Sequence, residues 1–140
     1  MAYKPMPNGM IPLDYFPAVY KALWLWLAAN PGHSSREWPK WRHNGGPIPS
    51  CVDFQPECEY VRVMADLRGV ADSCSMCPVH KLGSCLRPAS PYTNFIKALR
   101  LGGPASVLVS IAEECAALPF TPFHNDDDRK AYAERCGGDE

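Results

Sequence analysis

Four cysteines in the middle of the chain have the spacing of a structural zinc site. Cys74 and Cys77 are separated by two residues, and the turn between them can aim both sulfurs at one ion. Two further ligands must come from a distance, and Cys58 and Cys85 are the natural candidates. Four thiolates make a closed tetrahedral site, which holds a fold together and keeps no position for a catalytic water. We therefore expect a structural metal at these cysteines.

Neither the full set of ligands nor the identity of the metal is fixed by the spacing alone. Either Cys51 or His80 could replace one of the four ligands, and the spacing does not choose between them. The seven cysteines are an odd number and fall below the density of secreted disulfide scaffolds, so disulfides are the weaker interpretation. Pro78 follows the close pair as in some iron–sulfur proteins, but the cysteine run of small ferredoxins is missing. Zinc is the favoured cofactor, with an iron–sulfur cluster or no metal as alternatives.

The motifs of several enzyme classes are missing from the sequence. A zinc deaminase needs H-x-E and P-C-x-x-C, whereas here His33 precedes two serines and Ser73 precedes Cys74. H-E-x-x-H, the P-loop, G-x-G-x-x-G and G-x-S-x-G do not occur. A cysteine nucleophile paired with one of the four histidines stays open, because such pairs meet only in space. We expect a protein that is not an enzyme.

The composition is that of one globular domain with an unusual amount of proline. A chain of 140 residues can bury roughly 68% of its unfolded surface. The 15 prolines are about twice the usual frequency, and proline cannot donate to a helix or sheet ladder. The sequence therefore predicts a mainly α fold, a compact irregular domain of about five or six short helices with a zinc-knuckle-like cysteine cluster.

Charge and hydropathy restrict the partners and the compartment. With 14 basic and 15 acidic residues, the net charge of −1 gives no general attraction to nucleic acid. The N-terminus lacks the charged-then-apolar pattern of a secretory signal. The longest apolar run, 22–29, is far shorter than the ~20 residues that span a bilayer. No membrane partner is expected, and thiolate ligands favour the reducing cytoplasm.

The single predicted domain, 1–140, has three parts. An extended arm (1–13) packs through Met6, Met10 and Ile11, a helical core (14–118) holds the metal knuckle (51–85), and an acidic C-terminal segment (119–140) follows. Caps, prolines and apolar periodicity predict helices over 18–29 after a cap at Asp14, from Ser34, over 57–68, 91–101, 104–118 and 129–136. Pro17 suits an early helical position, Ser34 and Glu37 have the spacing of a capping box, and Gly69 and Gly102 should end the helices that precede them. Helix 104–118 should bury a stripe made of Val107, Leu108, Ile111, Cys115 and Leu118.

Two tryptophans with basic neighbours form a candidate partner-binding surface. Trp38 and Trp41 lie three residues apart and share a face, next to Lys40, Arg42 and His43. Such rings can stack on bases or grip a peptide, and they can equally seal a small core. Helix 18–29, which holds Trp24 and Trp26, has the same two interpretations, and because it is apolar on nearly every side the core is favoured.

An acidic run precedes the last expected helix. Asp126, Asp127 and Asp128 can cap that helix, because carboxylates favour a helix N-terminus. The alternative is that these carboxylates bind a divalent ion, although the patterned ligand loop of an EF-hand is absent. We expect the residues from Cys136 onward to be a frayed tail.

The order of several short motifs resembles a known group of proteins. These motifs are Trp38-Pro39-x-Trp41, Asn44-Gly45-Gly46, Cys58-Glu59-Tyr60, Cys74-x-x-Cys77-Pro78, Cys85 and Pro91-Tyr92. Over roughly residues 20–118 the chain resembles small, cysteine-rich, zinc-binding accessory proteins of phages and prophages, whose function is unassigned. The resemblance implies a viral protein in the bacterial cytoplasm and supplies no catalytic residues. In that family a cysteine stands where this chain has Gln55, which makes Cys51 the candidate substitute.

Two functions follow from these observations. The first is a non-enzymatic zinc-binding accessory protein that binds a host or viral protein, such as an inhibitor of a bacterial defence system of the anti-CRISPR kind. The alternative is a nucleic-acid-binding zinc protein, which requires its cations to gather on one face. Those cations are Lys40, Arg42, His43, Lys81, Arg87, Lys97 and Arg100.

Overall fold

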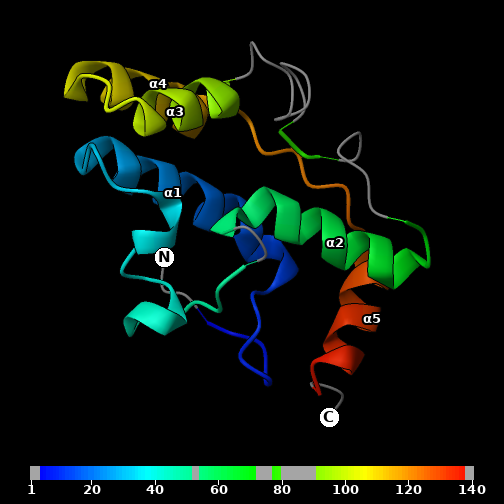
Figure 1. Ribbon diagram of the computed structural model, residues 1–140. Coiled ribbons are helices and arrows are strands. Elements are labelled where there is room, and N and C mark those ends of the chain that lie inside the picture. The colour runs from blue at the N-terminus through cyan, green and yellow to red at the C-terminus, as the bar shows by residue number, and fades with distance from the viewer. Residues whose placement is uncertain (1–3, 52–53, 72–76, 80–90, 138–140) are drawn as a thin grey trace.

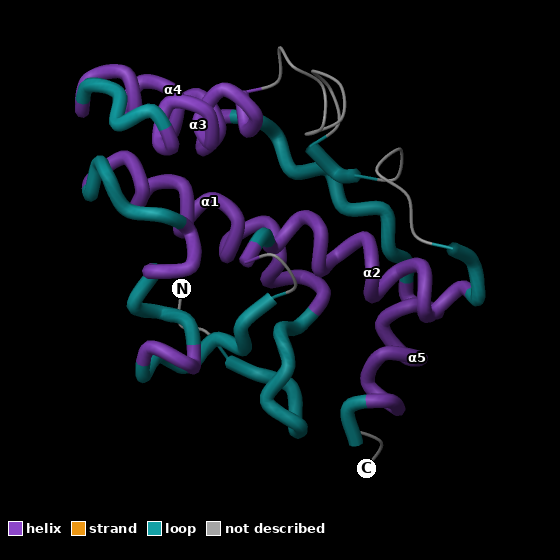
Figure 2. The backbone as a smooth tube through the Cα atoms, in the orientation of Figure 1, coloured by secondary structure: helices purple, strands orange, loops and turns teal. Residues whose placement is uncertain are grey.

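The computed structural model describes residues 4–51, 54–71, 77–79 and 91–137 of the chain (Figure 1). Within these residues there are five α-helices, three short 3-10 helices and no strand (Figure 2). The expected mainly helical fold is therefore confirmed, whereas the positions of Cys74, His80 and Cys85 lie outside the described residues. No described helix combines the length and the apolar character needed to cross a membrane.

Helix α1 (Phe16–Ala29) is the centre of the fold, with α3 and α4 along one side and the N-terminal loops on the other (Figure 1). Pro17 lies in its first turn, where a missing N–H costs nothing, and Asn30 ends it by donating from Nδ2 to the carbonyl of Trp26 at 2.9 Å. Trp24 and Leu27 are fully buried, so the core interpretation of this helix holds. Asp14 does not cap the helix as expected, because its carboxylate binds His124 and Arg129.

Helices α3 (Pro91–Arg100) and α4 (Ala105–Ala117) form a hairpin that packs on α1. Gly102 makes the turn with a φ of +65°, a conformation that glycine adopts without strain. Phe95 of α3 meets Trp24 of α1 edge to face, with ring centroids 5.0 Å apart. Leu108 and Cys115 are buried as expected, but Val107 is 42% exposed and Ala112 takes the buried position instead.

Helices α2 (Pro56–Arg68) and α5 (Asp126–Arg135) cross at the other end of α1 (Figure 1). Gly69 ends α2 in the left-handed conformation, as its sequence predicts. Helix α5 begins three residues earlier than expected, because Asn125 caps it and the acidic residues occupy its first turn. Cys136 is only 4% exposed, so the predicted frayed tail is wrong at its first residue.

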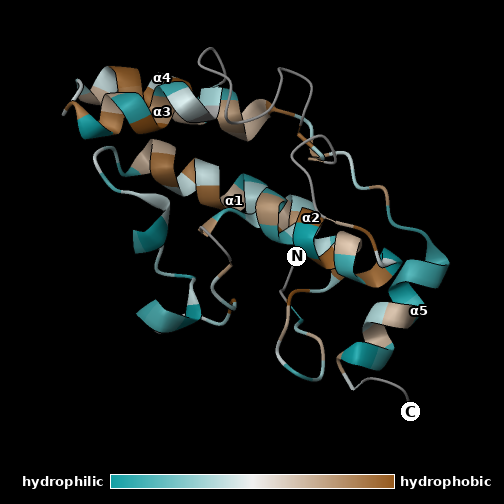
Figure 3. Cartoon of the chain, turned by 45° about the vertical axis from the view of Figure 1, so that its right-hand side comes forward, coloured by the Kyte–Doolittle hydropathy of each residue, from teal (hydrophilic) through white to brown (hydrophobic). Residues whose placement is uncertain are grey.

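The segment between α1 and α2 folds as two 3-10 helices, Ser35–Glu37 and Arg42–Asn44. The predicted capping box at Ser34 is present, since its N–H donates to the Glu37 carboxylate at 2.7 Å, but it starts only one short turn. Figure 3 shows these turns largely teal, whereas α1 carries brown bands between paler ones. The N-terminal arm packs through Ile11, which is buried, and through Met6 and Met10, which are partly buried.

Candidate metal centre

The structure describes two of the four predicted ligands, and it places both next to the core. Cys58 lies in the first turn of α2, where the positive end of the helix dipole favours a thiolate. Cys77 begins the short described stretch 77–79, in which the carbonyl of Pro78 accepts from the N–H of Thr121 at 3.0 Å. Both cysteines are half-buried. The stretch is therefore held against the linker that joins α4 to α5.

The described residues do not complete a metal site by themselves. Across 4–51, 54–71, 77–79 and 91–137, no three His, Cys, Asp or Glu side chains gather closely enough to hold an ion. A complete ligand set for Cys58 and Cys77 therefore has to include residues outside this part, as the predicted Cys74 and Cys85 do. The zinc centre stays a prediction.

Cys51, the predicted substitute ligand, lies in an unfavourable environment for a thiolate. Its side chain is 5% exposed, and its sulfur is 3.9 Å from the carbonyl of Pro49. Burial raises the pKa of the Cys51 thiol strongly, and the carboxylates of Glu59 and Glu57 raise it further. Because zinc binds the thiolate, this thiol is a poorer ligand than a partly exposed one.

Gln55, which stands where the resembled family has a cysteine, points to another part of the fold. It is 2% exposed, and its Nε2 donates to the Ser35 hydroxyl at 3.1 Å. This hydrogen bond ties the start of α2 to the 3-10 helix Ser35–Glu37. The residue therefore has a structural role at this position.

Glu57 is a buried acid that the sequence analysis did not single out. It is 4% exposed, and no described residue makes a hydrogen bond to its Oε1. Desolvation raises the pKa of this carboxyl to about 7. Buried titratable groups surround it, and its carboxylate adds to the burial that raises the pKa of Tyr20, Cys51 and Cys115. Only its burial could have revealed it, because a Glu in the first turn of a helix normally faces solvent.

The predicted Trp surface is buried. Trp38 is 3% exposed and Trp41 is fully buried, and their rings meet edge to face at 5.1 Å. The indole N–H of Trp41 donates to the carbonyl of Ser35 at 2.7 Å. These rings seal a small core, so the expectation that they offer a partner surface is corrected.

The basic neighbours of this pair are exposed, but two of them hold local structure. Arg42 donates from Nη2 to the carbonyl of Gly9 at 2.9 Å, and His43 lies 2.6 Å from the Ser50 hydroxyl. Lys40 is exposed. Helix α3, whose last turn holds Lys97 and Arg100, lies on the opposite side of α1 from this segment (Figure 1). The described cations therefore do not form the single basic face that nucleic-acid binding requires.

A hydrogen-bond network centred on Tyr60 connects four segments of the chain. Its phenol oxygen accepts from the N–H groups of Phe123 at 2.8 Å and His124 at 3.1 Å, and it lies 2.8 Å from Nδ1 of His124. Nε2 of His124 lies 2.7 Å from Asp14, which also binds Arg129. Tyr60 is fully buried, so no substrate can reach this oxygen, and the network is structural.

The acidic segment is engaged by arginines. Asp126 pairs with Arg129 at 2.5 Å, and Asp128 pairs with Arg68 of α2 at 2.8 Å. Asp128 also accepts from the N–H of Asn125, and Asn125 accepts from the N–H of Asp128, both at 3.0 Å. The cap is therefore Asn125 and not the acidic run as predicted, although Asp128 completes the capping box from within the first turn.

Comparisons with known proteins give no match to a family model, a curated protein or a solved structure.

Proposed function

We propose that the chain is a non-enzymatic zinc-binding protein whose helical surface binds a protein partner. The observation that supports the metal is a division among the described cysteines. Cys51, Cys115 and Cys136 are buried, and burial raises the pKa of each thiol. Cys58 and Cys77 are half-buried. The two described members of the predicted ligand set are thus the two whose burial least opposes the thiolate form.

Zinc held by Cys58, Cys74, Cys77 and Cys85 would connect the first turn of α2 to the part of the chain that precedes α3. Helix α3 begins the α3–α4 hairpin, which covers α1. A closed four-sulfur site supplies a cross-link and no reaction chemistry. The metal would therefore fix the hairpin relative to α2, and the function would depend on the surfaces that it holds in place.

The partner surface that we propose is the hairpin tip, which we define as Leu101 and Val107. These residues flank the α3–α4 turn and are 75% and 42% exposed. Apolar side chains on a near-neutral protein favour a protein partner over nucleic acid. The resemblance to phage-encoded proteins makes a bacterial host complex, such as a defence complex in the cytoplasm, the first partner to test.

Elemental analysis of the purified protein tests the metal. We expect about one zinc per chain, lost in Cys58→Ser and Cys77→Ser and retained in the control Cys115→Ser, whose thiol lies in the core. Cys51→Ser and His80→Ala, measured in parallel, identify whether either group is the substitute ligand. Zinc-free wild-type protein with an unchanged melting temperature after chelation would refute the metal centre.

Affinity capture with one double variant and one single control variant tests the partner surface. Leu101→Asp combined with Val107→Asp should abolish a specific interaction, whereas Val70→Asp, also an exposed apolar residue but located after α2, should keep it. A steep fall of binding with rising salt would instead indicate phosphate contacts, and it would favour the nucleic-acid alternative.

A further inference from the structure

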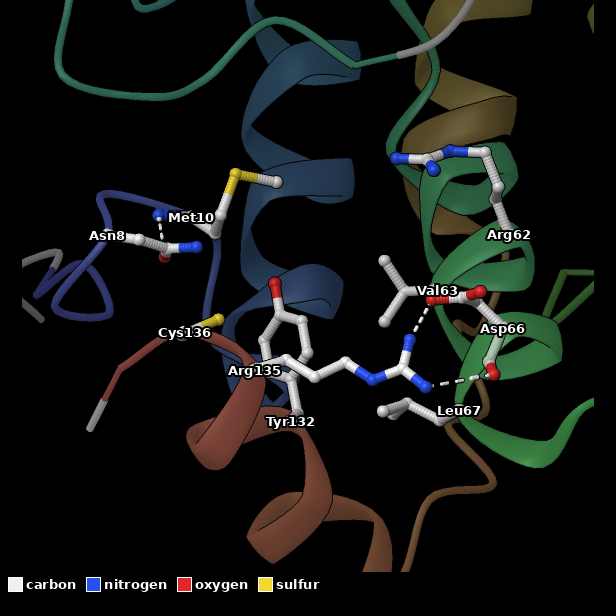
Figure 4. Close-up of a pocket in the computed structure, with 9 residues that line it drawn as sticks. All are labelled: Asn8, Met10, Arg62, Val63, Asp66, Leu67, Tyr132, Arg135 and Cys136. Atoms are coloured by element: carbon white, nitrogen blue, oxygen red, sulfur yellow. Dashed lines mark hydrogen bonds and ion pairs between the residues drawn. The ribbon is translucent and has the colours of Figure 1, made fainter. Parts of the chain in front are cut away.

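A cavity of about 200 Å³ lies where the N-terminal arm, α2 and α5 meet (Figure 4). Its floor is apolar and consists of Val63 and Leu67 from α2, the ring of Tyr132 from α5 and Met10 from the arm. The Tyr132 hydroxyl donates to the carbonyl of Ile11 at 2.8 Å, which fixes the ring. The cavity therefore has a rigid hydrophobic surface at its base.

Two arginines, Arg62 from α2 and Arg135 from α5, are among the residues that line this cavity (Figure 4). Arg62 gives Nε and Nη2 to Glu59, a carboxylate that is only 5% exposed. Arg135 gives Nη1 to the carboxylate of Asp66, which is 68% exposed. In the described part of the chain, Nη1 of Arg62 and Nε of Arg135 have no acceptor, so each guanidinium keeps a donor for a ligand.

We propose that this cavity binds a small carboxylic acid that carries one aromatic ring or branched aliphatic group. The apolar group would lie on Val63, Leu67 and Tyr132, and the carboxylate would face Arg62 and Arg135. An engineered apolar cavity of about 150 Å³ holds benzene, so about 200 Å³ admits one ring with a short arm. Guanidinium groups are the side chains best suited to a carboxylate. This site does not depend on the zinc centre or on the hairpin tip.

A change at Asp66 distinguishes a ligand site from an ion pair that only stabilises the surface. Its exposed carboxylate already occupies Arg135, and a ligand carboxylate has to compete with it. Removing the charge of Asp66 should therefore strengthen binding, which is the opposite of what loss of a structural contact would do.

Titrations with phenylacetate, followed by NMR at the backbone amides of residues 63, 67 and 132, test the chemistry. We expect a dissociation constant on the order of 1 mM, as suits a ligand of about ten heavy atoms. Phenylacetamide, which lacks the charge, should bind about tenfold more weakly, and acetate, which lacks the ring, should leave these amides unmoved. Equal affinity for the acid and the amide, or no response to phenylacetate, would overturn the proposal.

Two pairs of variants test the residues. Asp66→Asn should bind phenylacetate about threefold to tenfold more tightly, whereas Glu134→Gln, which changes the net charge equally from an exposed site outside the cavity, should not. Arg135→Gln should bind about tenfold more weakly, and the exposed Lys130→Gln is its matched control. Unchanged or weaker binding by Asp66→Asn would contradict the predicted competition.

Discussion

Replacing Tyr60 by Phe removes one oxygen from the centre of the network and keeps the ring. That ring is fully buried and meets Phe16, Phe120 and Phe123 at centroid distances between 5.2 and 5.4 Å. Phenylalanine can keep these contacts, so the substitution creates no large cavity. Any loss of stability therefore reports on the hydrogen bonds of the phenol.

The hydrogen bonds of Tyr60 allow only one arrangement of protons. The two backbone N–H groups occupy both lone pairs of the phenol oxygen, so the phenol proton must be donated to Nδ1 of His124. Nδ1 is then an acceptor, and the histidine carries its proton on Nε2, where it is donated to Asp14 at 2.7 Å. We expect ¹⁵N NMR of the imidazole to show this neutral Nε2–H tautomer in the native protein.

Tyr60→Phe leaves two backbone donors and one buried nitrogen without their partner. Each unsatisfied buried group costs about 1–3 kcal/mol. The His124 side chain is only 2% exposed, whereas residues 123 and 124 as a whole are half-buried, and water can reach part of the linker. Taking the low end for all three groups, we expect a loss of about 3 kcal/mol in the free energy of unfolding.

Urea denaturation of the wild type and two variants measures this loss. The control is Tyr20→Phe, which removes a single hydrogen bond, from the phenol to the carbonyl of Cys115 at 2.8 Å. It should cost about 1 kcal/mol, at an unchanged slope of stability against denaturant. A loss below about 1 kcal/mol for Tyr60→Phe, or a loss equal to that of the control, would refute the reasoning that Tyr60 is a three-way junction.

Three further predictions concern acid stability, a close approach and a cap. The pKa of Asp14 is lowered chiefly by its hydrogen bond to His124, and the pKa of Asp128 is lowered chiefly by its hydrogen bond to Arg68. Both carboxylates therefore stabilise the fold at pH values above 3.8, the pKa of an unfolded Asp. This stabilisation is lost as the pH falls through the lowered pKa of the folded state. Stability curves from about pH 6 to pH 2 should therefore fall steeply below about pH 4, and less steeply in Asp128→Asn. Gly46→Ala should cost about 2–4 kcal/mol in thermal unfolding, since a Cβ there would overlap the backbone of Lys40, whereas Gly45→Ala meets no atom and should cost about 1 kcal/mol for its φ of +93°. Asn125→Ala should cost about 1 kcal/mol by loss of the α5 cap, and an unchanged midpoint would contradict the capping geometry.

The helices could be predicted because their signals are local. Pro17, Gly69 and Gly102 act within one turn of the residues that they start or stop, and each has the predicted effect in the structure. The capping box at Ser34 is also present, but a capping signal does not fix helix length, and only one 3-10 turn follows. The local sequence signals therefore predict where a helix starts or stops better than how long it is.

The surroundings of the site could not be predicted, because burial is decided by segments far apart in the sequence. Trp38 and Trp41 could have been core or surface by pattern alone, and the folding of 30–51 against α1 decides that they are core. Cys136 looked like a tail residue, yet Tyr132 and Asn8 enclose it. The periodicity of α2 identifies Tyr60 only as an apolar position, although its oxygen accepts hydrogen bonds from residues more than 60 positions away.

The network of Tyr60 and the predicted zinc would act on neighbouring parts of the same linker. Residues 118–125 connect α4 to α5, and they are held by Pro78 through Thr121 and by Tyr60 through Phe123 and His124. Loss of metal at Cys77 would loosen the first attachment and leave the second in place, because the hydrogen bonds of Tyr60 to Phe123 and His124 involve no metal ligand. Chelation should therefore expose the amides near residue 121 to hydrogen exchange before those at 123 and 124, since local opening follows the weakest attachment. Simultaneous loss of protection at both places would mean that the two attachments form one cooperative unit, and that the proposed zinc stabilises α5 as well as the α3–α4 hairpin.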